Sequence, residues 1–211
     1  MQTYKQSQSS GFRGWRDFMR HGYRSFNSTG ALAPSSRWLA RKIVKPLVQL
    51  RSLANGKSLN VLEAGAGNGA ASAHIAPLLH PGDSFTMVEI NPAFTDGLRR
   101  WIESDAVSKL GLAEVTLVSD PIATVPAVGG YDVILSGLPH KNFGLQAATE
   151  TFDWYFDALR PGGVLSFIRL AHLPPGPVDK MILQRYRSFG TGRAYVPLNI
   201  PPAWVCYLQK P

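Results

Sequence analysis

The chain of 211 residues is 45% hydrophobic and carries a net charge of +8, which suits one α/β domain with an appendage. Its single cysteine, Cys206, excludes an internal disulfide and a zinc site built from cysteines. The apolar runs are too short to cross a bilayer, and the N-terminus is too charged and too aromatic for a signal peptide, so we expect a cytoplasmic protein.

The excess of positive charge lies in residues 1–51. They contain ten Lys and Arg against one acid, Asp17, which gives +9, whereas the other 160 residues contain 12 basic and 13 acidic groups and sum to −1. A neutral body with a basic N-terminal segment predicts an anionic partner, either the phosphates of a nucleic acid or those of lipid head groups.

Residues 10–26 predict an amphipathic helix. At about 100° per residue, the large apolar side chains fall on one side of this helix and the charged side chains fall on the other. The apolar side holds Phe12, Trp15, Phe18, Met19, Tyr23 and Phe26, and the charged side holds Arg13, Arg16, Asp17, Arg20 and Arg24. Such a helix needs a surface to lie on, which is the rest of the protein, a nucleic acid or a membrane.

A second helix is predicted over residues 36–54, where apolar residues repeat at helical spacing and Pro46 introduces a kink. From residue 59 the pattern changes to short apolar strands that alternate with helices. We expect strands at 59–65, 83–90, 115–120, 131–139 and 164–170, helices at 70–79, 92–104, 145–160 and 178–188, and two antiparallel edge strands at the C-terminus. The alternation predicts a doubly wound, mostly parallel sheet with helices on both faces. We therefore divide the chain into an N-terminal helical extension, 1–57, and a catalytic domain, 58–211.

A glycine-rich turn joins the first predicted strand to the helix after it. The segment LNVLEAGAGNGAA places Gly65, Gly67 and Gly69 where the backbone turns tightly and approaches a ligand. The second strand ends in Glu89, where a carboxylate can bind both hydroxyls of a ribose. Gly65-x-Gly67-x-x-Ala70 also satisfies a looser fingerprint for NAD, so the turn alone does not identify the nucleotide.

Four features together resemble class I S-adenosylmethionine-dependent methyltransferases: E-x-G-x-G-x-G from Glu63, the strand-end Glu89, Ser119-Asp120, and LRPGG before the fifth strand. The resemblance implies a Rossmann-like fold with a seven-stranded sheet, S-adenosylmethionine as cofactor and S-adenosylhomocysteine as product. It implies that Glu63 and the glycines hold the methionine end, that Ile90 packs on the adenine, and that Asp120 binds its amine. The remaining implied cofactor-binding residues are Ser136 and Gly137. A nucleotide-binding protein of another kind is the alternative.

The fourth strand ends in SGLPHKNF, residues 136–143, at the position where nucleic-acid adenine methyltransferases carry an NPPY-like segment. That segment gives a base-flipping enzyme its stacking platform, which is missing here. The form SGLPxxNF instead resembles bacterial phospholipid N-methyltransferases, as do GALAPSSRWLARKI (30–43) and NIPPAWVCYL (199–208). The resemblance implies successive methylation of phosphatidylethanolamine, through monomethyl and dimethyl intermediates, toward phosphatidylcholine.

The same resemblance implies that the N-terminal helix lies on the inner face of the cell membrane, with arginines on anionic head groups and aromatic residues in the interface. The predicted membrane-binding residues are Phe12, Arg13, Trp15, Arg16, Phe18, Met19, Arg20 and Arg24. We expect the partners to be a phospholipid substrate and an anionic membrane surface, with no nucleic acid and no metal ion, and we expect a monomer in solution.

Three overlapping groups of residues are candidates for the acceptor site. Tyr23, His21 and His140 are candidates to orient the amine or relay its proton. The candidates for substrate binding are Ser35, Ser36, Arg37, Pro139, Asn142 and Phe143, although each can also serve the fold alone. Tyr23, Phe143 or Trp204 can line an apolar pocket for the growing cation.

Two other functions stay open. One is an RNA or DNA adenine N-methyltransferase, favoured by the basic N-terminal segment, and the other is a membrane-binding or remodelling protein with a vestigial cofactor fold. Detergent micelles are expected to activate a lipid enzyme and not an RNA enzyme. Failure to bind S-adenosylmethionine would favour the remodelling protein.

Overall fold

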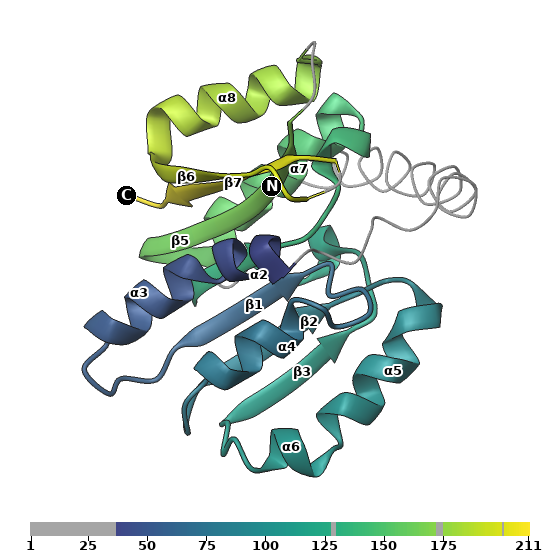
Figure 1. Ribbon diagram of the computed structural model, residues 1–211, viewed down its shortest axis with the longest axis vertical. Coiled ribbons are helices and arrows are strands. Elements are labelled where there is room, and N and C mark those ends of the chain that lie inside the picture. Colours follow the sequence, from purple (N-terminus) through teal and green to yellow (C-terminus); the bar gives the residue numbers. More distant parts are fainter. Residues whose placement is uncertain (1–36, 128–129, 172–174, 200) are drawn as a thin grey trace, which may run out of the picture.

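The computed structural model describes residues 37–127, 130–171, 175–199 and 201–211. A seven-stranded sheet with the order β3-β2-β1-β4-β5-β7-β6 forms its centre (Figure 1). The strands are β1 (Asn60–Ala64), β2 (Ser84–Val88), β3 (Glu114–Val118), β4 (Tyr131–Ser136), β5 (Leu159–Leu170), β6 (Gly190–Val196) and β7 (Ala203–Gln209). The first five are parallel, and β7 is antiparallel to both β5 and β6. The strand order reverses at β1 and β4, because β2 and β3 lie on one side of β1, and β4 and β5 lie on the other.

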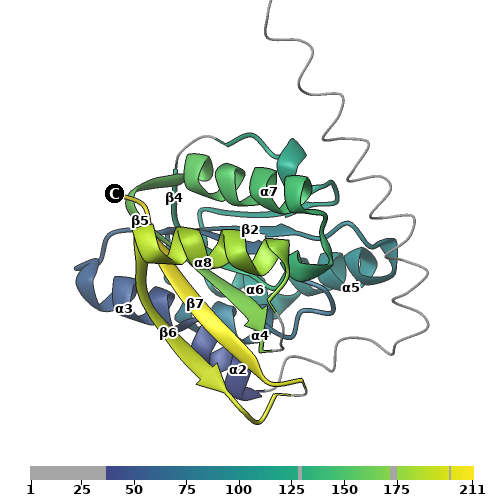
Figure 2. The ribbon, with the colours of Figure 1, turned by 90° about the horizontal axis from the view of Figure 1, so that it is seen from above.

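Helices cover both faces of the sheet, as the alternating pattern predicts (Figure 2). One face packs against α7 (Leu145–Ala158) and α8 (Pro177–Phe189), and the other packs against α2 (Arg37–Ile43), α3 (Lys45–Leu53), α4 (Ser72–Ile75) and α5 (Pro92–Ile102). A short helix, α6 (Asp105–Ser108), and the 3-10 turns η1 (Ala76–Leu78), η2 (Ile122–Thr124) and η3 (His140–Asn142) complete the elements. The predicted doubly wound fold is confirmed. Among the described residues, no helix is long and apolar enough to cross a membrane.

Three local features differ from the sequence prediction or refine it. Strand β7 lies between β5 and β6, so of the two C-terminal strands β6 alone is an edge strand, whereas we expected both to be edge strands. The predicted helix 70–79 is a single α-helical turn followed by η1, because Pro77 lacks the N–H that would continue the α-helix. The kink predicted at Pro46 is a break between α2 and α3 at Val44.

The first two described helices belong to the core. Leu39 and Ile43 of α2 and Leu47 of α3 are almost completely buried against the sheet. The hydroxyl of Tyr207 on β7 also donates a hydrogen bond of 2.8 Å to the carbonyl of Lys42. These contacts place α2 beside the ends of β5 and β7. The predicted helix 10–26 lies outside the described residues.

Candidate functional site

The glycine turn, residues 65–69, follows β1 where the carboxyl ends of the parallel strands lie, at the point where the strand order reverses. Gly65, Gly67 and Gly69 all have positive φ, at 77°, 55° and 81°. A Cβ on Gly65 would lie 2.7 Å from the side chain of Leu138, so the turn has no room for a larger residue there. A Cβ on Gly67, in contrast, would meet nothing within 4 Å. The backbone of Gly67 therefore borders open space, as a ligand-binding turn requires.

Glu63 is a carboxylate within the buried central strand. Its side chain is 2% exposed, and one oxygen accepts a hydrogen bond of 2.6 Å from the hydroxyl of Ser72, the first residue of α4. The other oxygen, Oε1, is buried without a partner among the described residues. Burial raises the pKa of Glu63 to about 8, with a further increase from the nearby Glu89, although the bond from Ser72 lowers it. Without a ligand this carboxyl group keeps its proton at neutral pH, and an arriving cation would favour its ionised form and pair with the buried oxygen.

Glu89 holds the glycine turn from the end of β2. One carboxylate oxygen accepts from the N–H of Gly67 at 2.7 Å, and the other accepts from the N–H of Asn91 at 2.7 Å. Asn91 in turn caps α5 through its side chain, which accepts from the N–H of Ala93. The carboxylate is thus fixed beside the open space at Gly67.

These residues fit the predicted cofactor. The buried orphan oxygen of Glu63 suits the ammonium of the methionine end, and the carboxylate of Glu89 lies next to the turn that would bring a ribose toward it. Ile90 is half-buried against the core, and Asp120 is exposed just after β3, so both lie at the same edge of the sheet. The individual roles stay predictions.

A buried polar network lies at the end of β4. The hydroxyl of Ser136 is 2.7 Å from that of Tyr155 on α7 and 3.4 Å from Nε2 of His140, and Nε2 is 3.1 Å from the hydroxyl of Tyr155. Burial lowers the pKa of His140 to about 3 and raises the pKa of Tyr155 far above its ordinary value. The imidazole is therefore neutral, and its Nδ1 is buried without a partner among the described residues. The rings of Phe143, Phe152, Tyr155 and Phe167 surround it.

A pocket opens beside this network at the carboxyl ends of β4 and β5. Four of the predicted residues line it: Gly137, Pro139, His140 and Asn142. Phe143 is 5% exposed and packs its edge against His140, whereas the hydroxyl of Ser136 faces the buried network. Gly137 also joins the pocket to the glycine turn, because its N–H donates to the carbonyl of Ala64 at 2.9 Å.

Several predicted residues fall outside the described part of the chain. These are Tyr23, His21, Ser35, Ser36 and the eight membrane-binding residues of the predicted helix 10–26. Arg37 begins α2, but its side chain is not described. Their roles stay predictions.

The sequence prediction missed residues that line the pocket or support it. Arg169, Asp179, Asn199 and Leu39 line it, and Tyr155 anchors the polar network. Arg169 carries a detectable signal, because it is a charged residue near the end of an otherwise apolar strand, VLSFIRL. Tyr155 carries none, because it lies in an apolar run of α7 and resembles any core aromatic residue.

The comparisons with known proteins agree with this geometry. No protein-family model matches the chain. The chain is 29% identical over 189 residues to an ornithine lipid N-methyltransferase of Singulisphaera acidiphila, a match that covers 88% of each protein. The bacterial lipid N-methyltransferase resemblance predicted from the sequence motifs therefore extends over most of the chain.

Solved structures show the same fold. A 1,6-didemethyltoxoflavin-N1-methyltransferase of Burkholderia thailandensis, with bound S-adenosylhomocysteine, is 17% identical with a TM-score of 0.62, over 94% of this chain and 89% of that chain. A magnesium protoporphyrin IX methyltransferase of Synechocystis PCC 6803, with bound S-adenosylmethionine, is 13% identical with a TM-score of 0.62, over 96% of this chain and 92% of that chain. The chain has the class I methyltransferase fold, and these bound molecules agree with the predicted cofactor.

Proposed function

We propose that this chain, which has the class I methyltransferase fold and resembles a bacterial lipid N-methyltransferase, transfers methyl groups from S-adenosylmethionine to the amine of a membrane lipid head group. The observation that carries the proposal is the position of the two sites. The glycine turn after β1 and the pocket beyond β4 lie at adjacent strand ends, joined by the hydrogen bond from Gly137 to Ala64. A methyl donor in the first site would face an acceptor in the second.

The residues of the chain position the reactants. Bound S-adenosylmethionine supplies an electrophilic methyl group to an amine lone pair. Glu63 would hold the ammonium of the methionine end through its unpartnered oxygen, and Glu89 would bind the ribose. The apolar side chains that line the pocket, among them Leu39, Leu138 and Ile182, would exclude water from the amine, which must be neutral to act as a nucleophile.

His140 is proposed to orient the amine rather than to take its proton. A pKa of about 3 makes the imidazole a weak base, and Nε2 lies within reach of the hydroxyls of Tyr155 and Ser136. In the tautomer that carries its proton on Nε2, Nδ1 can accept a hydrogen bond from a substrate N–H. Tyr23 remains the other predicted candidate for this step.

The head group is the finer part of the proposal. Phosphatidylethanolamine is the substrate that the sequence motifs predict, with successive methylation toward phosphatidylcholine. The related protein of Singulisphaera acidiphila is named for ornithine lipid, which makes an amino-acid lipid the second candidate. Both lipids present an amine beside an anionic group.

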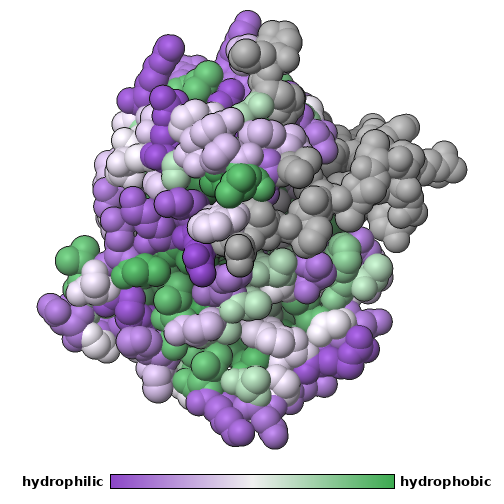
Figure 3. Space-filling model, in the orientation of Figure 1, coloured by the Kyte–Doolittle hydropathy of each residue, from purple (hydrophilic) through white to green (hydrophobic). Residues whose placement is uncertain are grey.

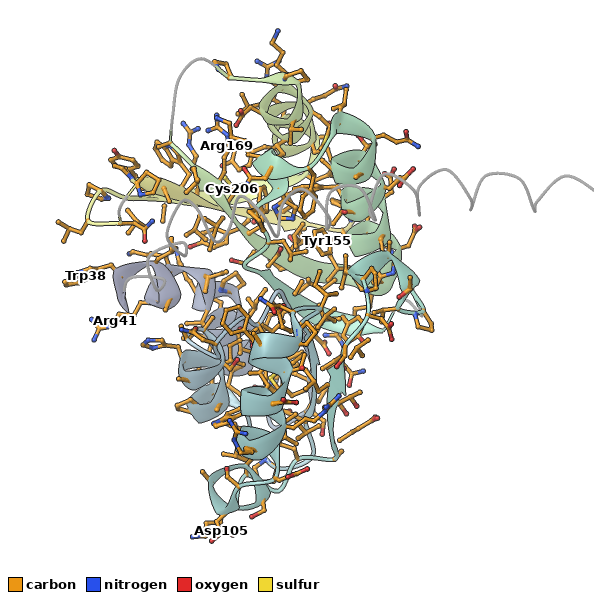
Figure 4. All side chains as sticks on the ribbon, turned by 90° about the vertical axis from the view of Figure 1, so that its right-hand side faces the viewer. Trp38, Arg41, Asp105, Tyr155, Arg169 and Cys206 are labelled. Atoms are coloured by element: carbon orange, nitrogen blue, oxygen red, sulfur yellow. The ribbon has the colours of Figure 1, made fainter. Side chains whose placement is uncertain are left out.

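The surface around the pocket supports a location on a membrane. Trp38 is 41% exposed and Leu198 is 65% exposed, and each is the sequence neighbour of a pocket residue, Leu39 or Asn199. The guanidinium of Arg41 lies over the ring of Trp38 at 5.7 Å. Both side chains project on the same side as the connection between β6 and β7 (Figure 4). Apolar side chains also gather in patches between hydrophilic ones on the face that carries α2 and α3 (Figure 3).

Aromatic and basic side chains beside a pocket entrance suit an anionic interface. We therefore propose that the chain binds the inner face of the cell membrane peripherally, through the predicted helix 10–26 and the rim at Trp38 and Leu198. Flotation with anionic vesicles measures this binding. Deletion of residues 1–26 is expected to reduce the floated fraction, and an unchanged fraction would contradict the role of the helix.

The activity is tested by radiolabelled methyl transfer from S-adenosylmethionine to vesicles that contain phosphatidylethanolamine, ornithine lipid or neither, with products separated by thin-layer chromatography. Label in mono-, di- or trimethylated lipid is expected with the vesicles that contain phosphatidylethanolamine or with those that contain ornithine lipid. Label in added RNA and none in lipid would overturn the proposal. A Glu89→Ala variant is the control and is expected to transfer no label, because it lacks the carboxylate beside the glycine turn.

A further inference from the structure

Arg169 lies near the carboxyl end of β5 and lines the acceptor pocket. Its side chain is only 15% exposed, whereas arginine side chains usually lie in open solvent. Figure 4 shows Arg169 close to Cys206, in the part of the molecule where β5 and β7 pair. A mostly buried guanidinium in a substrate pocket needs an explanation.

Asp179 explains the position of Arg169 but uses only one edge of its guanidinium. The Nε–H of Arg169 donates to one oxygen of Asp179 at 3.0 Å. The other oxygen of Asp179 accepts from the N–H of Gly176, at the start of α8, also at 3.0 Å. The carboxylate is 3% exposed and accepts a hydrogen bond on each oxygen, so it connects β5 to the start of α8.

Only Nε of Arg169 bonds to Asp179, and its two terminal nitrogens make no hydrogen bond to a described residue and are not fully buried. These nitrogens form a planar fork that matches two oxygens of a carboxylate or a phosphate. Because Asp179 holds the Nε edge, the fork is pre-organised, which lowers the entropy lost when an anion binds.

The local charge also favours an anion. Residues 159–211 contain seven Lys and Arg and a single acid, Asp179, so their sum is 7 − 1 = +6. A second arginine, Arg193 on β6, lies over the ring of Trp204 at 4.7 Å, and Trp204 pairs with Arg169 across β5 and β7. Both guanidinium groups are close enough to lower the pKa of Cys206, against the burial that raises it to about 11.

We propose that Arg169, held by Asp179, binds the anionic group of the lipid substrate and thereby places the neighbouring amine at the methyl-transfer site. The inference rests on the proposed function and adds a substrate class to it, namely zwitterionic lipids that carry an amine beside a carboxylate or a phosphodiester. The amino-acid lipid supplies the carboxylate, and phosphatidylethanolamine supplies the phosphodiester. A plain alkylamine supplies neither.

The test uses the double variant Arg169→Gln/Asp179→Asn, which removes both charges together and leaves no buried carboxylate unpaired. With the full chain and mixed micelles, we expect the KM for the zwitterionic lipid to rise about tenfold or more, and the KM for a long-chain alkylamine to change much less. Arg169→Lys keeps the charge but loses the planar fork, so its KM for the zwitterionic lipid is expected to lie between those of the wild-type protein and the double variant. An equal loss on the alkylamine and the lipid would overturn the inference.

A matched control is Arg185→Gln. Arg185 also pairs with a carboxylate, that of Asp153 at 2.6 Å, but it lies on the part of α8 that faces α7 and does not line the pocket. Its loss is expected to leave the KM for every substrate unchanged. Circular dichroism of each variant establishes that the fold is intact.

A binding measurement separates this inference from the proposed function. Short-chain phosphatidylethanolamine and an N-acyl ornithine are titrated calorimetrically into the protein saturated with S-adenosylhomocysteine, which requires no turnover. Weaker binding to the double variant supports the role of Arg169 even if no methyl transfer is seen, and the preferred probe identifies the anion. Equal binding to the wild-type protein and the double variant, or no binding of either probe to the wild-type protein, would overturn it.

Discussion

Glu63 is expected to make the stability of the unliganded protein fall as the pH rises. Burial raises the pKa of its carboxyl from 4.5 to about 8 in the folded protein, and unfolding returns it to the ordinary value. The folded protein therefore keeps a proton that the unfolded chain releases between these pH values. This contribution to stability is complete below about pH 4.5 and is lost as the pH rises toward about 8.

The magnitude follows from the pKa difference. At about 1.4 kcal/mol per pH unit, the change from 4.5 to about 8 corresponds to about 5 kcal/mol, of which about 4 kcal/mol falls above pH 5. The variant Glu63→Gln keeps the side-chain shape and an oxygen that can accept from Ser72, but it does not titrate. Its free energy of unfolding, relative to that of the wild-type protein, is expected to rise by about 4 kcal/mol between about pH 5 and about pH 8.5.

Urea denaturation of the unliganded proteins at several pH values measures this difference. Glu103→Gln is the control, because Glu103 is exposed and its replacement is expected to change stability by less than about 0.5 kcal/mol at every pH. A stability difference between Glu63→Gln and the wild-type protein that stays constant from about pH 5 to about pH 8.5 would refute the buried, protonated carboxyl.

Three further predictions test the polar network, an ion pair and the glycine turn. Tyr155→Phe leaves two buried partners, Ser136 and His140, short of a hydrogen bond, so it is expected to cost about 1–3 kcal/mol in urea denaturation. Asp83→Ala removes a fully buried carboxylate that holds the guanidinium of Arg51 and two backbone N–H groups, and it is expected to cost about 3–5 kcal/mol in the same assay. Gly67→Ala is expected to cost only about 1–2 kcal/mol for its left-handed backbone, but to weaken S-adenosylhomocysteine binding by about tenfold or more in calorimetry, because its methyl group enters the open space.

Each of these predictions has a matched control. Tyr131→Phe loses only a long hydrogen bond of 3.4 Å, and Asp96→Ala breaks an exposed ion pair, so both are expected to cost less than about 1 kcal/mol. Gly56→Ala has the same backbone strain as Gly67→Ala and open space around it, but it lies in the turn before β1, at the opposite edge of the sheet. If Gly56→Ala weakens cofactor binding as much as Gly67→Ala, the effect is one of stability and the assigned site is wrong.

The fold could be predicted from the sequence because its signals are local. Apolar strands that alternate with amphipathic helices determine a doubly wound sheet, and Gly65 and Glu89 mark the ligand-binding edge. The prediction that β7 is an edge strand was wrong, because strand pairing depends on residues that are distant in the sequence. The nearly continuous apolar run of β7, AWVCYL, is typical of an interior strand.

The acceptor pocket was predicted only in part. Gly137, Pro139, His140 and Asn142 were predicted because they follow a strand end directly, whereas Arg169 and Asp179 are ten residues apart and lie on different elements, β5 and α8. Tyr155 lies between two other aromatic residues of α7, Trp154 and Phe156, and its role depends on the packing of α7 over β4. A single sequence can show that Arg169 is unusual in an apolar strand, but it does not show which residues of other elements these side chains contact.

The measurement that tests the central claim most directly is mass spectrometry of the lipids after incubation with S-adenosylmethionine and the full chain, with fragmentation that isolates the head group. Added methyl groups on the head-group nitrogen of phosphatidylethanolamine or of ornithine lipid are the predicted result, and they disappear in the Glu89→Ala variant. Unchanged masses of both lipids, with S-adenosylmethionine shown to bind the protein, would contradict the lipid N-methyltransferase account.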